Sequence, residues 1–140
     1  RTTEYSEPME FIPANSIGTL TNSGVRSEQL LSPENSHSQR VTITRVTVPP
    51  ACTSPRHIHD MSEQTWVALS GAGTLLLAGG QERAFFEGDV VRFSDGDTHG
   101  VINRESKPFV YISVTCPPIN FRSAYEKGWT ENAGLDNGAG

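Results

Sequence analysis

The sequence predicts an all-β fold, a sandwich or small barrel of antiparallel strands with little or no helix. Runs rich in β-branched and aromatic residues recur about every 8–12 residues between residues 41 and 115, as strands do in such folds. Glycine-containing turns separate many of these runs. No long apolar pattern with helical periodicity interrupts them.

The first strand of the predicted body is Val41–Val48, whose sequence VTITRVTV is dense in β-branched residues. Pro49 and Pro50 end it, because proline cannot donate a hydrogen bond to a neighbouring strand. Gly79 and Gly80 predict a tight hairpin, since glycine accepts the positive φ angles of such turns. Six further strands are predicted: Gln64–Ser70, Thr74–Ala78, Glu82–Phe86, Val90–Phe93, Gly100–Asn103 and Phe109–Thr115.

The chain is expected to form one domain, because 140 residues suffice for a single hydrophobic core. Residues 1–36 are polar and broken by prolines and glycines, which indicates an N-terminal arm with short strands. Residues 37–118 form the predicted barrel. Residues 119–140 are a C-terminal extension, in which Ser123–Lys127 predicts one helical turn and Ala133–Gly140 is expected to be disordered.

Composition and charge exclude several classes of function. The net charge is −5 and the only lysines are Lys107 and Lys127, so the basic surface of a nucleic-acid-binding protein is missing. The sequence has no apolar run as long as a membrane-spanning helix and no apolar leader after Arg1, so we expect a cytoplasmic protein without a membrane partner. Cys52 and Cys116 are expected to be free thiols in a reducing compartment.

The sequence resembles the two motifs of the cupin family. Residues 57–71 read HIHDMSEQTWVALSG and residues 88–103 read GDVVRFSDGDTHGVIN, with glycines, histidines and asparagine at the spacing of the family. Only Ser94 departs in the second motif, at a turn position where the family usually has proline. The resemblance implies a double-stranded β-helix, the jelly-roll barrel. The ligands it implies for one divalent transition-metal ion are His57, His59 and His99.

The spacing of the first two ligands fits this reading. Residues two apart on a strand point to the same face, so the imidazoles of His57 and His59 can share one ion. On its own such a pair is often solvent-exposed. The second motif, which adds His99, makes the metal site the favoured interpretation.

The fourth ligand stays open between three residues. The glycine spacing of the family, counted back from Gly71, places it at Gln64, and strand alternation turns Glu63 to the opposite face. We therefore favour Gln64 over Glu63. His37, at the start of the strand predicted at 41–48, is a further candidate, although its serine-rich surroundings favour a surface loop.

The predicted ligands determine the expected chemistry. Three imidazoles favour a transition metal, here zinc, iron, nickel, manganese or copper, over calcium or magnesium. With Gln64 as a neutral fourth ligand the ion keeps its full charge, which favours enolate or phenolate donors and acidifies a bound water. That water is the expected base, and Asp60 or Glu63 is the fallback base.

Three residues are candidates for the pocket. Trp66 and Val101 are expected to line an apolar cavity above the metal, and Tyr111 faces either the cavity or solvent. Arg45 is either a buried substrate clamp or part of an outer face. Phosphate substrates are not expected, because Arg45 and Arg92 are the only basic candidates within the barrel motifs.

The favoured hypothesis is a metal-dependent enzyme that binds the enolate or phenolate of an oxygenated, largely apolar small molecule. Cupins similar to this chain include ring-cleaving dioxygenases of the quercetinase type and aromatic polyketide cyclases. The alternative is a non-enzymatic module that binds a small ligand while the metal braces the fold. A sugar isomerase is a weaker third hypothesis, because polar and basic barrel residues are few. The family resemblance also implies a homodimer.

Overall fold

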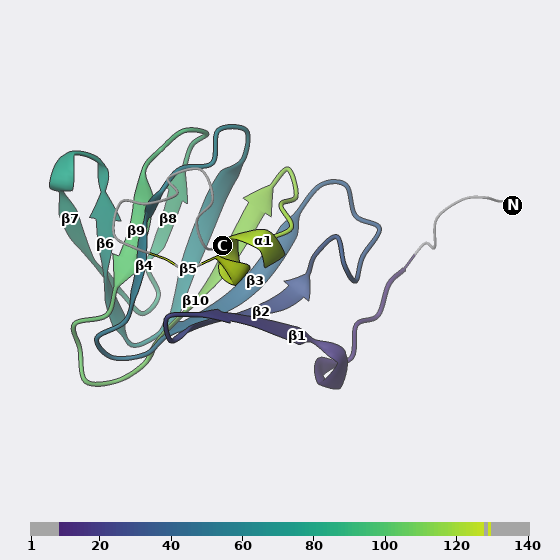
Figure 1. Cartoon of the computed structure of the whole chain (residues 1–140), viewed down its shortest axis with the longest axis horizontal. Coiled ribbons are helices and arrows are strands. Elements are labelled where there is room, and N and C mark those ends of the chain that lie inside the picture. Colours follow the sequence, from purple (N-terminus) through teal and green to yellow (C-terminus); the bar gives the residue numbers. More distant parts are fainter. Residues whose placement is uncertain (1–8, 128, 130–140) are drawn as a thin grey trace, which may run out of the picture.

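The computed structural model describes residues 9–127 and 129, and within them the chain forms two antiparallel β-sheets that face each other (Figure 1). The larger sheet has the order β1-β2-β3-β10-β5-β8, and the smaller has the order β4-β9-β6-β7. The described strands are β1 (Gly18–Asn22), β2 (Val25–Leu31), β3 (Thr42–Val48), β4 (Thr53–His57), β5 (Glu63–Ser70), β6 (Ala72–Leu77), β7 (Glu82–Phe86), β8 (Val90–Phe93), β9 (His99–Ile102) and β10 (Phe109–Cys116). This arrangement is the all-β double-sheet barrel that the sequence predicts.

The core lies between the two sheets. In β3 and β10 every second residue is buried, as alternating strand faces require. One end of this interior is apolar, with Val48 and Phe109 paired in register and fully buried. The predicted hairpin between β6 and β7 is confirmed, with Gly79 and Gly80 at φ 67° and 74°.

The predicted N-terminal arm with short strands contains β1 and β2. β2 pairs with β3 and β1 pairs with β2, so both strands continue the larger sheet. The inward positions of β2 are Val25, Ser27 and Gln29, and all three are buried. Because two of these are polar, the usual alternation of apolar and polar residues is hidden in the sequence.

A single turn of helix, α1 (Arg122–Glu126), follows the last strand and confirms the helical turn predicted at Ser123–Lys127. Phe121 and Tyr125 bury their rings in the core, and α1 packs against β1. Asn22 at the end of β1 donates a hydrogen bond of 3.0 Å to the carbonyl of Tyr125. The predicted disorder of Ala133–Gly140 lies outside the described residues.

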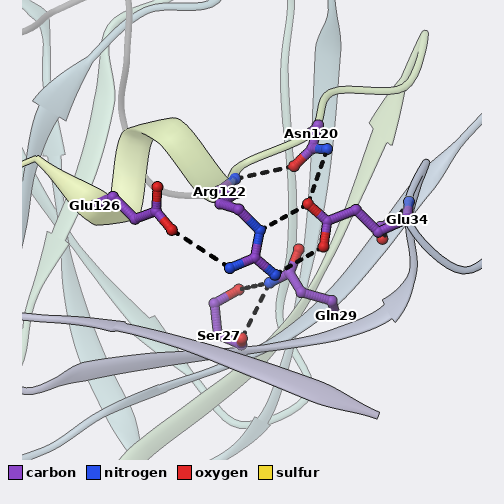
Figure 2. A network of polar contacts seen from close by, with 7 residues as sticks. Ser27, Gln29, Glu34, Asn120, Arg122 and Glu126 are labelled. Carbon is purple, nitrogen blue, oxygen red and sulfur yellow. Dashed lines mark hydrogen bonds and ion pairs between the residues drawn. The ribbon is translucent and has the colours of Figure 1, made fainter. Parts of the chain in front are cut away.

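A polar network connects α1 to the loop after β2 (Figure 2). The guanidinium of Arg122 donates two hydrogen bonds of 2.7 Å to the carboxylate of Glu34, and a 3.4 Å contact joins it to Glu126. Asn120 also donates to Glu34. These contacts hold the segment after β10 against the larger sheet.

The outer face of β3 decides the open alternative for Arg45. Arg45 lies on the outer face of β3 and forms an ion pair of 2.6 Å with Glu28, so it is not a buried clamp. Cys52 and Cys116 are free thiols, as predicted. Among the described residues, no helix is long and apolar enough to cross a membrane.

Candidate metal centre

His57 is the last residue of β4 and points into the barrel, where it is fully buried. Between Ser54 and His57 the register with β9 shifts, which marks an irregular bulge. Gly100 of β9 faces this bulge. A β-carbon at position 100 would stand only 2.8 Å from backbone atoms of Ser54 and Pro55, so the close approach of the two strands requires glycine.

His59 lies two residues beyond the end of β4, and the residue is 6 % exposed. The strand is shorter than the predicted pattern implies, but the alternation of faces persists through Ile58. The amide of Gly96 donates a hydrogen bond of 2.9 Å to the carbonyl of His59, so the turn of the second motif fixes the loop of the first. Gly96 adopts φ 82°, which favours glycine.

His99 opens β9 and is paired in register with His57. The ring of Phe93 stacks on it with ring centroids 4.5 Å apart, and Trp66 meets it edge-on at 5.6 Å. These contacts fix the orientation of the imidazole from the side of the larger sheet. The ring centroids of His57 and His99 are 4.3 Å apart.

The three histidines present one ligand nitrogen each, and these nitrogens all lie within 4.8 Å of one another. Nδ1 of His57 lies 2.7 Å from the carbonyl oxygen of Pro55, and Nδ1 of His99 lies 2.9 Å from that of Asp97. A carbonyl oxygen only accepts, so Nδ1 of each ring carries the proton and Nε2 keeps its lone pair. The Nε2 atoms of His59 and His99 are buried and have no hydrogen-bond partner among the described residues.

Burial keeps the rings of His59 and His99 neutral. Loss of hydration, followed by repulsion from His57, lowers the pKa of His59 to about 3. Burial is also the largest cause that lowers the pKa of His99 well below its usual range, with His57 and His59 adding to it. Three buried imidazoles whose ligand nitrogens converge on one point are a ligand set for a transition-metal ion. The residues present therefore fit such an ion.

The other predicted ligands are placed differently. Gln64 points inward and is fully buried, as the strand parity predicts, but both ends of its amide are engaged. Its Oε1 accepts from Nε1 of Trp66 at 2.9 Å, and its Nε2 donates to Oγ1 of Thr115 at 3.0 Å. Gln64 as a fourth ligand stays a prediction. His37 lies exposed in the loop before β3, outside the histidine group.

Glu63 does not face the histidines. It lies on the outer face of β5, where its carboxylate accepts a hydrogen bond of 3.0 Å from Arg92 and both side chains are about half exposed. Glu63 therefore does not suit the role of fallback base, because one step along a strand reverses the face. Asp60 is exposed in the loop after His59.

The three candidate pocket residues are all fully buried and belong to the core. Trp66 and Tyr111 stack with ring centroids 4.3 Å apart, so Tyr111 faces the interior rather than solvent. That they line a cavity above the metal stays a prediction. The interior is more polar than the sequence analysis expects, because the inward face of the larger sheet also carries these side chains: Ser27, Gln29, Thr42, Thr44, Gln64, Ser113 and Thr115.

A hollow of about 520 Å³ lies elsewhere, beside strands β7 and β8. Phe86 and Val90 line it and are exposed by 58 % and 62 %. None of the three histidines lines it, so its shape says nothing about the metal centre.

Two residues support the site without being ligands, so a search for ligands does not identify them. Gly100 is the first, and a glycine within a strand pattern is the signal that could have identified it. Asn103, which stands on the second motif, is the other. Its amide donates to the carbonyls of Val48 and Lys107 at 2.8 Å and accepts from the amide of Glu105, so it fixes the end of β9 rather than binding a ligand.

Comparison with known proteins agrees with this geometry. The sequence model of the Cupin domain matches residues 44–115, which span β3 to β10 and contain all three histidines. The chain is a cupin. No protein with a curated description matches it in sequence.

Solved structures similar to this cupin differ in their described activities. The polyketide cyclase RemF from Streptomyces resistomycificus has a TM-score of 0.67 and 16 % identity, covering 91 % of this chain and 90 % of its own. A sugar phosphate isomerase of the cupin superfamily from Silicibacter pomeroyi has 0.65 and 21 %, covering 76 % and 75 %. A double-stranded β-helix protein from Klebsiella pneumoniae subsp. pneumoniae has 0.66 and 19 %, covering 79 % and 91 %. These similarities show the fold, a double-stranded β-helix, and leave the reaction open.

Proposed function

We propose that this cupin is a metal-dependent enzyme that binds an oxygenated small molecule through an enolate or phenolate oxygen. The observation that carries the proposal is the convergence of three buried imidazoles, whose ligand nitrogens lie within 4.8 Å of one another. His57, His59 and His99 would hold one divalent ion, either zinc or one of the redox metals iron, nickel, manganese and copper. When bound there, the ion supplies Lewis acidity that stabilises negative charge on the substrate oxygen.

The chain contributes orientation and exclusion of water. The carbonyls of Pro55 and Asp97 fix the tautomers of two ligands, and Phe93 and Trp66 hold the ring of His99 from the side. Phe121 covers His59 with ring centroids 5.9 Å apart. An apolar shell of this kind lowers the local dielectric constant, so electrostatic interactions at the site are stronger than in water.

Two reactions suit this arrangement, aromatic cyclisation of a polyketide and ring-cleaving dioxygenation. The similarity to the polyketide cyclase RemF is consistent with the first. Both reactions begin with proton removal from an enol, ketone or phenol. Glu63 faces outward and Asp60 is exposed, so neither candidate carboxylate is buried beside the histidines, and the proton passes to a water held at the site.

The experiment compares metal content and turnover in matched histidine variants. Full-length protein is loaded separately with zinc, iron, nickel, manganese and copper. It is then given a flavonol, with oxygen uptake as the readout, or a linear polyketone, with aromatic absorbance as the readout. His57→Ala and His99→Ala are expected to lose the metal and to reduce turnover by at least about 100-fold, as removal of first ligands or their supports does. His37→Ala, the exposed histidine, is the control and should keep both.

Two results would contradict the proposal. Turnover that persists in metal-free wild-type protein would remove the metal from the reaction. A protein that retains one metal ion, shows no exchangeable coordination position and converts neither compound would favour the binding module.

A further inference from the structure

The face of the larger sheet opposite the histidines carries a row of hydroxyl groups. Ser113 of β10 pairs in register with Thr44 of β3 on one side and with Trp66 of β5 on the other. Trp66 in turn meets His99 at 5.6 Å, so this register position lies at the level of the metal centre. Tyr111 precedes Ser113 by two residues and shares its inward face. We name Thr44, Tyr111 and Ser113 the hydroxyl row.

The hydroxyl row lacks partners within the protein. The side-chain oxygens of all three residues are buried and have no hydrogen-bond partner among the described residues. Thr42, two residues before Thr44 on the same face of β3, is different, because its hydroxyl bonds to both the amide and the carbonyl of Ile119. Native proteins leave few buried hydroxyls unpaired, because each lost hydrogen bond costs stability. Three in one row therefore indicate a partner that the chain does not supply.

The chemistry of the row is that of neutral donors and acceptors. Burial raises the pKa of the Tyr111 phenol well above its usual range, and the neighbouring Tyr125 adds to this, so the group remains a protonated donor. Among the described residues, the buried polar side chains include no lysine, arginine, aspartate or glutamate. Arg45 and Arg92 both lie on outer faces in ion pairs. A ligand with a charged group far from the metal would leave that charge unpaired.

We propose that the hydroxyl row is a second polar subsite, which hydrogen-bonds carbonyl or hydroxyl oxygens at the far end of an uncharged, polyoxygenated substrate. This inference rests on the proposed function, since the histidines hold the other end of the same molecule. Thr44, Tyr111 and Ser113 lie in the larger sheet, whereas His57 and His99 lie at the end of β4 and the start of β9 in the smaller sheet, so one molecule bound between the sheets would contact both sets. The subsite selects substrates by the number and position of their neutral oxygens.

The test uses two compounds that differ by a single hydroxyl. Kojic acid and allomaltol share the hydroxy-ketone pair that chelates a metal. Only kojic acid carries a further hydroxyl at the opposite end of the ring. With zinc-loaded full-length protein, calorimetry is expected to show kojic acid binding about fivefold more tightly, the effect of one buried hydrogen bond. Thr44→Val, Tyr111→Phe and Ser113→Ala together should reduce this preference to about onefold while changing allomaltol affinity less than about twofold.

Thr47→Val, which removes a hydroxyl from the outer face of the same strand as Thr44, is the matched control and should keep the preference. Thermal unfolding of the metal-free variants supplies an independent readout. Removing a hydroxyl without a partner should leave the midpoint unchanged or raise it. Thr42→Val should lower the midpoint, since Thr42 loses two hydrogen bonds to Ile119.

Each contrary outcome separates the subsite from the proposed function. If both compounds bind wild-type protein equally, the subsite is contradicted and the proposed function stands. If Thr44→Val and Ser113→Ala destabilise as much as Thr42→Val, the hydroxyls serve the fold through buried water, which also contradicts the subsite. If neither compound binds the zinc-loaded protein, the proposed function is contradicted and the subsite with it.

Discussion

Gly100 has no side chain, and this allows the two strands that carry His57 and His99 to approach each other closely. It stands opposite the bulge that turns His57 inward, and its missing side chain lets β9 approach the backbone of Ser54 and Pro55. The same approach brings the rings of His57 and His99 to 4.3 Å. Any side chain at position 100 must separate the two strands that carry these ligands.

We expect Gly100→Ala to destabilise the metal-free protein by about 1–3 kcal/mol, the usual cost of overpacking a rigid interior. The β-carbon would meet backbone atoms at 2.8 Å, and backbone cannot move aside as a flexible side chain does. Urea unfolding followed by tryptophan fluorescence measures the loss. Gly18→Ala is the control, because no atom lies within 4 Å of a β-carbon at position 18. Equal midpoints for the two variants would show that β4 and β9 adjust freely.

The element that closes the structure is the segment from Asn120 to α1. It places Phe121 over His59 and buries Tyr125, and its polar contacts reach Glu34 in the loop after β2. The guanidinium of Arg122 and the amide of Asn120 lower the pKa of Glu34 to about 2. The pair is solvent-exposed on both sides, so its stabilising effect is small and sensitive to salt.

This element predicts a defined pH dependence. The carboxylate of Glu34 has a lower pKa in the folded state than its ordinary value of 4.5, so folding favours its charged form. The contribution of the pair is therefore complete above pH 4.5 and declines as the pH falls toward about 2. Arg122→Ala should lower the unfolding free energy slightly at pH 7, and this difference should be lost as the pH falls through about 2.

Denaturant unfolding of wild-type and variant protein at several pH values checks this difference. Arg104→Ala is a matched comparison that should show the same pH trend, because Arg104 and Glu82 form an ion pair of the same length and exposure away from α1 and Arg104 lowers the pKa of Glu82. A difference that grows as the pH falls would contradict the assigned role of Glu34. High salt should reduce the effect of both substitutions.

The strand pattern in the sequence predicted most of the fold. The features that were not predicted have physical reasons. β-branched runs such as the one in β3 alternate clearly, because their inward residues pack against the facing sheet. The bounds of β2 were not predicted, because its inward positions include Ser27 and Gln29. The three histidines were found through their motif spacing. The bulge in β4 and the engaged amide of Gln64 depend on contacts between strands far apart in sequence, which a single sequence does not reveal.

At the scale of the whole molecule, the metal centre couples distant parts of the chain. Its ligands lie at the end of β4, in the following loop and at the start of β9, so a bound ion links segments that are 42 residues apart in sequence. An ion that binds only the folded state stabilises that state by mass action.

The homodimer implied by the family stays a prediction, which light scattering of the full chain tests.

Zinc is therefore expected to raise the thermal midpoint of the metal-free protein. At free zinc about 100-fold above the dissociation constant, linkage contributes about 2.7 kcal/mol. For a domain of this size that corresponds to roughly 10 °C, measurable by differential scanning calorimetry. His99→Ala should lose most of this shift, because only two imidazoles remain, whereas His37→Ala should keep it since that ring is exposed in a loop. An equal shift of the thermal midpoint in wild-type and His99→Ala protein would mean that zinc binds elsewhere. It would contradict the proposal that zinc stabilises the fold through the three histidines.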